Sequence, residues 1–313
     1  MLYDILMVAI GLAVLVFAGD ALVKGAVNLS LRLGVPALIV GLTVVSIGTS
    51  APELFVSVEA VLKGAPALAL GNVVGSNIAN ILLVLGIPAL ITAVPVAREL
   101  GRDWAIMMGA SVLFIALSFT GAIGWWQALV LLAALVGLLW LWYVRAVEHR
   151  NDRTEAEVLE AAEDGMSALK IAAYLLAGIV GLPVGANLLV DGAVNIATVL
   201  GVSEAVIGLT LVAVGTSLPE LATTVAAAWR REAGVALGNV LGSNVFNLLG
   251  IIGIAGLVGT IPVPPEMLRI DLWVMLGASL LLGFFILTRR PIGRVWGVAL
   301  ILLYAGYVFS LFY

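Results

Sequence analysis

Two acidic residues, Glu53 and Glu220, stand deep inside long apolar stretches of this 313-residue chain. An ionisable side chain at such a depth in a membrane costs about 2.5–3.5 kcal/mol on insertion scales, and it is therefore usually functional. A purely structural role would require a buried basic partner, and these stretches carry no Lys or Arg at comparable depth. The two carboxylates therefore predict a buried site that binds a cation.

Each glutamate directly follows a proline, within the sequences GTSAPE and GTSLPE. Proline has no amide hydrogen, so Pro52 cannot donate to the carbonyl of Gly48, and Pro219 cannot donate to that of Gly215. The residue before a proline is also disfavoured in the helical conformation. We therefore expect each helix to break near Gly-Thr-Ser, and irregular backbone at membrane depth is tolerated where it lines a cavity.

Further oxygen-bearing groups fall on the same helical faces as the glutamates. Positions three, four and seven residues apart lie on one face of a helix, and four such groups occur. They are Ser46, Ser50, Glu53 and Ser57; Ala213, Ser217, Glu220 and Thr224; Asn72, Ser76 and Asn80; and Asn239, Ser243 and Asn247. A single polar stripe is ordinary helix packing, but four stripes in two matching pairs predict a cage of oxygen ligands.

An all-oxygen cage suits calcium, which takes about six to eight oxygen ligands in a flexible geometry. Softer transition metals usually recruit Cys or His. The chain has no Cys, and its single histidine, His149, stands in a charged loop. The two carboxylates match the charge of one Ca2+ or of two Na+. Competition between these ions for one site would couple their movements across a membrane.

The glutamates belong to a duplicated segment, which covers residues 41–86 and 208–253. Aligned without a gap at an offset of 167, the two copies are identical at 23 of 46 positions. The identities are mostly Gly, Ser, Thr, Asn, Pro and Glu rather than interchangeable aliphatic residues. Two copies with such chemistry predict one site that is built from two related halves.

The composition is that of a membrane protein, because 63% of the residues are hydrophobic, 11% are charged and the mean hydropathy is +1.19. A spanning helix needs about 20 apolar residues. We count ten such segments, at 3–28, 36–62, 67–93, 103–119, 123–144, 168–190, 203–229, 234–258, 270–288 and 294–312. Five segments per half is an odd number, so the second half must enter the membrane inverted. The predicted fold is an all-α membrane protein of ten transmembrane helices in two inverted five-helix repeats, with broken helices 2 and 7.

The predicted boundaries are 1–144 for the first repeat, 145–167 for a cytoplasmic linker and 168–313 for the second, inverted repeat. Lys and Arg concentrate on the cytoplasmic side of membrane proteins. With the N-terminus outside, only Lys63 and Arg269 face outward, whereas thirteen basic residues face inward. These are Lys24, Arg32, Arg98, Arg102, Arg145, Arg150, Arg153, Lys170, Arg230, Arg231, Arg289, Arg290 and Arg294. Both termini are therefore expected outside and the linker in the cytoplasm.

The motifs GTSAPE and GTSLPE, together with GNVVGSN and GNVLGSN, resemble the cation/calcium exchanger superfamily, and most closely the prokaryotic sodium/calcium exchangers. The resemblance implies that Glu53 and Glu220 coordinate Ca2+ and Na+. The ligand set that it implies further includes Thr49, Ser50, Ser76 and Asn80, then Thr216, Ser217, Ser243 and Asn247, and the backbone carbonyls of Ser46 and Ala213. Several members carry Asp at the position of Asn247, so the ion stoichiometry and any potassium requirement stay open.

The resemblance implies a function, the secondary active exchange of Na+ for Ca2+ by alternating access in a prokaryotic plasma membrane. In that mechanism the first and sixth helices slide past the other eight, and small residues suit such sliding: Gly11, Gly19, Gly25, Gly178, Gly181 and Gly185. The expected partners are Ca2+, Na+ and the lipid bilayer, with no nucleic acid, no prosthetic group and no enzymatic activity. The alternatives are an H+/Ca2+ antiporter on the same fold and, less favoured, a cation channel.

Overall fold

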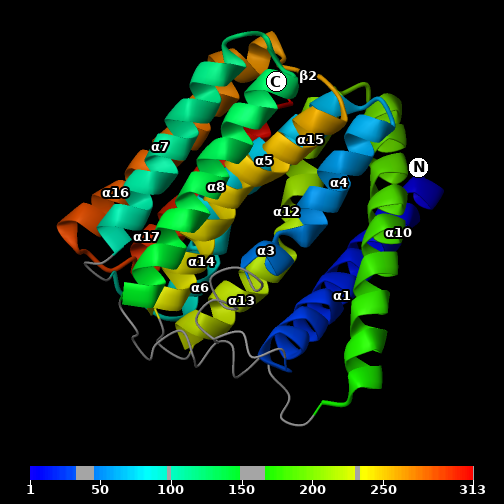
Figure 1. Cartoon of the computed structure of the whole chain (residues 1–313). Helices are drawn as coiled ribbons and strands as arrows, with labels where there is room; N and C mark the ends of the chain where they lie inside the picture. The colour runs from blue at the N-terminus through cyan, green and yellow to red at the C-terminus, as the bar shows by residue number, and fades with distance from the viewer. Residues whose placement is uncertain (33–45, 97–99, 149–165, 230–232, 313) are drawn as a thin grey trace.

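The computed structural model describes residues 1–32, 46–96, 100–148, 166–229 and 233–312, which form a bundle of helices (Figure 1). The first half contains α1 (Leu2–Arg32), α3 (Ser46–Thr49), α4 (Ala51–Leu62), α5 (Pro66–Ala79), η2 (Asn80–Val84), α6 (Gly86–Ile91), α7 (Leu100–Ser118), β1 (Ala122–Ile123) and α8 (Trp125–Glu148). The second half contains α10 (Ala168–Leu200), α11 (Glu204–Ile207), η3 (Gly208–Val212), α12 (Ala213–Thr216), α13 (Leu218–Trp229), α14 (Ala233–Phe246), η4 (Asn247–Ile251), α15 (Ile252–Val258), β2 (Ile261–Pro262), η5 (Met267–Asp271), α16 (Leu272–Thr288) and α17 (Arg294–Ser310). The strands β1 and β2 pair antiparallel, with Ile123 opposite Ile261.

The described helices are those of a membrane protein. Six segments are long and apolar enough to cross a bilayer, and a seventh qualifies if the bent pair Glu204–Thr216 and Leu218–Val225 is one span. Shorter apolar helices occur at Trp125–Leu141 and Arg294–Ser310. The predicted class of helical membrane protein is thus confirmed, whereas the count of ten and the inverted orientation stay predictions. The predicted segment 36–62 begins outside the described residues.

Two interrupted helices lie at the centre of the bundle (Figure 1). The span of α5, η2 and α6 is 78% buried over its most apolar window, and that of α14, η4 and α15 is 83% buried. The corresponding value for α1 and for α10 is 33%, so these two helices are peripheral. Each central span contains a π-helical turn, which begins at Asn80 in one and at Asn247 in the other. Such turns are rare in proteins, and those that occur often lie at functional sites.

Glycines bring the backbone of α5 against the backbone of α11 and η3. A Cβ atom added at Gly71 would lie 2.5 Å from the carbonyl oxygen of Ala205, and one at Gly75 would lie 2.6 Å from that of Leu209. Both distances are below any normal contact between carbon and oxygen. Only glycine at these two positions allows the central helix of the first half to approach the second half so closely.

The peripheral helices α1 and α10 pack along each other (Figure 1). A Cβ atom at Gly11 would lie 2.8 Å from the backbone nitrogen of Leu189, and one at Gly178 would lie 2.6 Å from the Cβ of Leu22. Gly25, Gly181 and Gly185 likewise face the opposite helix of this pair, and Gly19 alone faces Pro52 of α4. The glycines that were expected to line a sliding surface therefore mostly join α1 and α10 into one unit.

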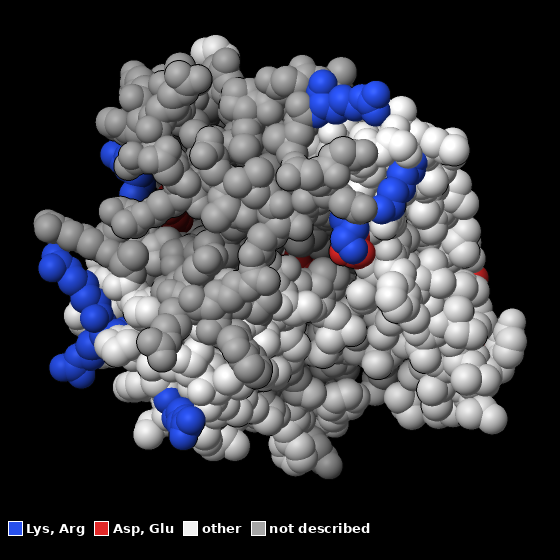
Figure 2. All heavy atoms as spheres, turned by 90° about the horizontal axis from the view of Figure 1, so that it is seen from below, with Lys and Arg blue, Asp and Glu red and all other residues white. Residues whose placement is uncertain are grey.

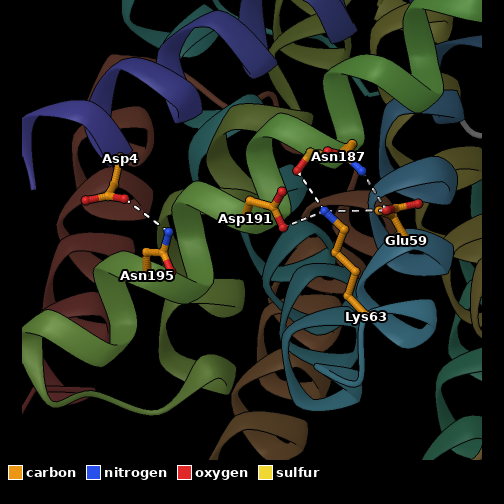
Figure 3. A network of polar contacts seen from close by, with 6 residues as sticks. All are labelled: Asp4, Glu59, Lys63, Asn187, Asp191 and Asn195. Carbon is orange, nitrogen blue, oxygen red and sulfur yellow. Dashed lines mark hydrogen bonds and ion pairs between the residues drawn. The ribbon is translucent and has the colours of Figure 1, made fainter.

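A polar cluster connects this two-helix unit to α4 (Figure 3). Lys63, which directly follows α4, lies 2.5 Å from Asp191 Oδ1 of α10 and donates to the backbone carbonyl of Asn187 at 3.3 Å. It also pairs with Glu59 at 3.6 Å, and the Asn187 side chain donates to Glu59 Oε1 at 3.1 Å. Charged groups therefore span the boundary between α10 and α4.

One end of the bundle carries many basic side chains. Figure 2 looks from below onto the view of Figure 1 and shows Lys and Arg spread around this face, with few Asp and Glu. The labels of both chain termini lie in the upper half of Figure 1. This distribution is the one expected if the basic end faces the cytoplasm, and the orientation itself stays a prediction.

Candidate cation site

The helix breaks occur where the prolines predict them. The helix α3 ends at Thr49 and α4 begins at Ala51, and the intervening Ser50 has φ −87° and ψ 9°, outside the helical region. The second half repeats this geometry, with Ser217 at φ −81° and ψ 9° between α12 and α13. The second-half segments meet at an angle of 43°. The predicted breaks in both halves are confirmed.

The two glutamates that follow these breaks are wholly buried, with no exposed surface. Each is bound by the serine of the opposite half, because Ser50 Oγ donates to Glu220 Oε1 at 3.1 Å and Ser217 Oγ donates to Glu53 Oε1 at 3.3 Å. The second carboxylate oxygen of each glutamate has no hydrogen-bond partner among the described residues. Each carboxylate is thus oriented by one oxygen and leaves the other available.

Two asparagines fix the backbone at the glutamates. The Asn72 amide donates to the carbonyl of Glu53 at 3.3 Å and to Ser57 Oγ at 3.0 Å. Asn239 makes the equivalent contacts in the second half, with the carbonyl of Glu220 at 3.5 Å and with the Thr224 hydroxyl at 3.3 Å. The polar stripes predicted from helical spacing therefore meet as pairs of neighbouring helices.

The predicted hydroxyl ligands differ in whether they already make hydrogen bonds. Ser76 Oγ donates to the carbonyl of Ala213 across the two halves at 3.5 Å. Thr216 Oγ1 donates to Asn72 Oδ1 at 3.0 Å. Ser243 Oγ is buried and has no described partner. The Ala213 carbonyl also accepts the Ser217 amide at 3.1 Å and lies 3.3 Å from the Thr216 hydroxyl, so three donors share this oxygen.

The remaining predicted ligands are Thr49 and Ser46 at the first helix break, and Asn80 and Asn247 in the central spans. Thr49 is half-buried at the first break, and Ser46 begins α3, although its side chain lies outside the described part. Asn80 and Asn247 are buried, and the Oδ1 atom of each has no hydrogen-bond partner in the described part of the chain. Their amide nitrogens donate to the two residues that pattern reasoning overlooked, Asn244 at 3.0 Å and Asn77 at 3.1 Å. The available signal was the repetition of Asn directly after Ser in both GNV-GSN motifs.

Most buried oxygens without partners in the described residues belong to the predicted ligand set. Five of the six such atoms in the described residues belong to predicted ligands: Glu53 Oε2, Glu220 Oε2, Asn80 Oδ1, Asn247 Oδ1 and Ser243 Oγ. A buried polar atom without a partner is costly, and more so when it carries charge. No group of three or more acidic, His or Cys side chains that could hold a metal ion occurs among the described residues. The charge of the predicted ligand set comes from Glu53 and Glu220. Such an arrangement can hold a small hard cation.

Known proteins are similar to this chain in sequence and in fold. The sequence model of the family described as "Sodium/calcium exchanger protein" matches residues 3–144 and 170–313. The sodium/calcium exchanger MaX1 of Methanosarcina acetivorans is 33% identical over 99% of both chains. The putative antiporter CaxA of Alkalimonas amylolytica is 35% identical over 100% of this chain and 99% of its own. The structure of the sodium-calcium exchanger NCX_Mj soaked with 2.5 mM Na+ and 0.1 mM Ca2+ is 32% identical, with a TM-score of 0.67 over 98% of each chain.

The chain belongs to the sodium/calcium exchanger family. The resemblance first indicated by the GTSAPE and GNVVGSN motifs is thereby confirmed, as is the prediction of a membrane transporter rather than an enzyme. In an exchanger of this family, Ca2+ and Na+ are transported ions and not a resident prosthetic group. That the oxygens described above bind these ions is still a prediction.

Proposed function

We propose that the protein is a secondary active antiporter that exchanges Na+ for Ca2+ by alternating access. The observation that carries the proposal is the pair of buried carboxylates, Glu53 and Glu220, each with one oxygen bound by the opposite half and one without a partner within the described residues. Uncharged buried oxygens without partners, on Asn80, Asn247 and Ser243, accompany them. A cation is the species that would satisfy all of these atoms together.

The charge of the site gives the exchange its logic. Two carboxylates neutralise one Ca2+ or two Na+, and an uncompensated charge in a low-dielectric interior is costly. Both ions prefer oxygen ligands, so they compete for the same atoms, and occupancy by one excludes the other. Because Ser50 and Ser217 each bind the carboxylate of the opposite half, the site forms only where both halves meet.

The proposal includes the finer architecture and ligand set. We propose ten spans in two inverted repeats, 1–144 and 168–313, with both termini outside and the 145–167 linker in the cytoplasm. The two stretches matched by the family sequence model, 3–144 and 170–313, support this division. The proposed ligands are Glu53, Thr49, Ser50, Ser76 and Asn80, with Glu220, Thr216, Ser217, Ser243 and Asn247, and the carbonyls of Ser46 and Ala213.

The coupling ion is tested with purified protein in liposomes. Sodium-loaded proteoliposomes should take up Ca2+ when they are diluted into sodium-free buffer, because exit of Na+ vacates the oxygens that Ca2+ needs. Uptake that ignores internal sodium and follows an imposed proton gradient would instead identify an H+/Ca2+ antiporter. Equilibration of Ca2+ without any counter-ion would identify a channel.

The carboxylates are tested by Glu53→Gln and Glu220→Gln. Glutamine keeps the volume and one amide oxygen but removes the charge that offsets dehydration of a divalent ion. Each variant should nearly abolish Ca2+ uptake while it still elutes as a folded protein. Glu266→Gln, which changes an exposed carboxylate, is the matched control and should transport normally. Near-normal transport by either site variant would place the cation elsewhere.

A further inference from the structure

Four buried asparagines form a hydrogen-bonded frame between the central spans. Asn80 Nδ2 donates to Asn244 Oδ1 at 3.0 Å, and Asn247 Nδ2 donates to Asn77 Oδ1 at 3.1 Å. In turn Asn77 Nδ2 donates to the backbone carbonyl of Asn244, and Asn244 Nδ2 donates to that of Asn77, both at 3.3 Å. None of the four is more than 1% exposed. The frame contains the same contacts twice, once for each half.

The backbone carbonyls determine which way the amides of Asn77 and Asn244 point. A carbonyl oxygen can only accept a hydrogen bond, so the side-chain group that faces it has to be the NH2 group. Each NH2 group also lies near a methionine sulfur, 3.8 Å from Met275 for Asn77 and 3.7 Å from Met107 for Asn244. If either amide turned over, it would set two oxygens against each other in a buried site. The Oδ1 atoms of Asn77 and Asn244 are therefore fixed as acceptors.

Fixed acceptors determine the direction of the next pair of amides. Asn247 has to present its NH2 group to Asn77, and Asn80 has to present its NH2 group to Asn244. Their own carbonyl oxygens then point away from the frame, and these are the two Oδ1 atoms that have no partner among the described residues. In the opposite orientation, NH2 groups would occupy those positions and would repel a cation.

We propose that Asn77 and Asn244 are positioning residues that turn the carbonyl oxygens of Asn247 and Asn80 toward the transported cation. They touch no ion themselves and act through the amides that they hold. This inference rests on the proposed function, because it requires that Asn80 and Asn247 ligate the ion. It assigns a role in ion affinity to the asparagine that directly follows serine in each GSN motif.

The test measures equilibrium binding of Ca2+ to the purified protein in sodium-free detergent buffer, together with thermal unfolding. Asn77→Leu and Asn247→Leu should each weaken Ca2+ binding by about tenfold or more, the effect of losing one well-oriented amide oxygen that contacts a charged ion. The double variant should bind no more weakly than Asn247→Leu alone, because Asn77 acts only through Asn247. Met275→Leu, which removes the sulfur near the same amide at similar volume, is the control and should bind as wild type does.

Contrary results would overturn the inference in distinct ways. Wild-type affinity in a folded Asn77→Leu variant, or additive losses in the double variant, would show that Asn77 does not act through Asn247. If the leucine variants do not fold, Asn77→Ala and Asn77→Gln replace them. The glutamine adds no charge and keeps an amide oxygen that can accept from Asn247, so it should bind Ca2+ more tightly than the alanine does, and equal binding refutes the role. A wild-type protein that binds no Ca2+ would instead refute the proposed function.

Discussion

The contact between Lys63 and Asp191 offers a direct test of movement between α10 and α4 (Figure 3). In the proposed alternating-access mechanism, the unit of α1 and α10 would change its position relative to the remaining helices, so a contact across this boundary should form in one conformation and break in the other. Lys63→Met keeps most of the side-chain length and removes the charge. Asp191→Asn removes the opposite charge at almost constant volume.

The size of the effect follows from the exposure of the two side chains. Lys63 is 24% exposed and Asp191 is 42% exposed, so water and salt screen the pair even though its atoms are 2.5 Å apart. Ion pairs of this kind contribute about 0.2–1 kcal/mol, which corresponds to about a 1.4- to 5-fold change in an equilibrium constant. The apparent affinity for an ion scales with the fraction of protein in the competent conformation. Either substitution should therefore shift apparent Ca2+ affinity within that range.

The assay measures the KM for Ca2+ presented on each face of the membrane, in proteoliposomes of defined orientation. Lys63→Met should change the two KM values in opposite directions, because a smaller population of the conformation open to one side leaves a larger population of the conformation open to the other. Asp191→Asn should give the same changes, and the double variant should add nothing further. Asp20→Asn is the control, since Asp20 pairs with Lys24 within α1 at 2.8 Å and this contact does not cross the boundary. Additive effects, or KM values that move together, would refute the reasoning.

Three further outcomes are expected from the site and its surroundings. Gly71→Ala should lower the unfolding temperature, because its Cβ would lie 2.5 Å from a carbonyl oxygen, whereas Gly277→Ala, with nothing described within 4 Å, should not. Ser50→Ala and Ser217→Ala should raise the KM for Ca2+ similarly, by about tenfold, since each removes a hydrogen bond to a buried carboxylate of the opposite half. Asn247→Asp would set a carboxylate against Asn77 Oδ1, so it either carries a proton or turns that amide over. Sodium inhibition of Ca2+ uptake should then change between about pH 6 and about pH 8 differently in this variant from wild type, and profiles identical to wild type would show that Asn247 does not face the ions.

Local chemistry made the helix breaks and the buried acids predictable from the sequence. A proline in an apolar span breaks a helix whatever surrounds it, so the interruptions at Ser50 and Ser217 follow directly from GTSAPE and GTSLPE. The isolation of Glu53 and Glu220 among apolar residues likewise needs no tertiary information. The duplication then indicated that both copies contribute to one site.

Contacts between helices were not predictable in the same way. Helical spacing places Ser50 on the face of Glu53, three residues away, yet its hydroxyl donates to Glu220 instead. The partner depends on how two broken helices cross, and a pattern along one chain does not contain that geometry. The same reason explains why Asn77 and Asn244 were overlooked, since their roles arise only where α5 meets α14.

The two halves carry matching residues at the site but different charged residues at the periphery. At the offset of 167, Glu53 corresponds to Glu220 and Asn77 to Asn244, and these residues make equivalent contacts. Lys63, in contrast, corresponds to Arg230, which lies outside the described residues, and its partner Asp191 corresponds to Lys24.

At the corresponding sequence positions, 24 and 230, two basic residues thus replace the pair of opposite charges. Two like charges cannot attract each other as Lys63 and Asp191 do. The conformation in which Lys63 contacts Asp191 therefore gains an attraction that positions 24 and 230 do not supply in the other conformation. A site with two equal halves can release ions to both sides, and unequal contacts at its edges give the two open conformations different energies. We therefore expect Arg230→Asp, which gives sequence positions 24 and 230 opposite charges, to move the two KM values for Ca2+ in the same sense as Lys63→Met does. A change of the two KM values opposite to that of Lys63→Met would show that charges at positions 24 and 230 do not oppose the contact of Lys63 with Asp191.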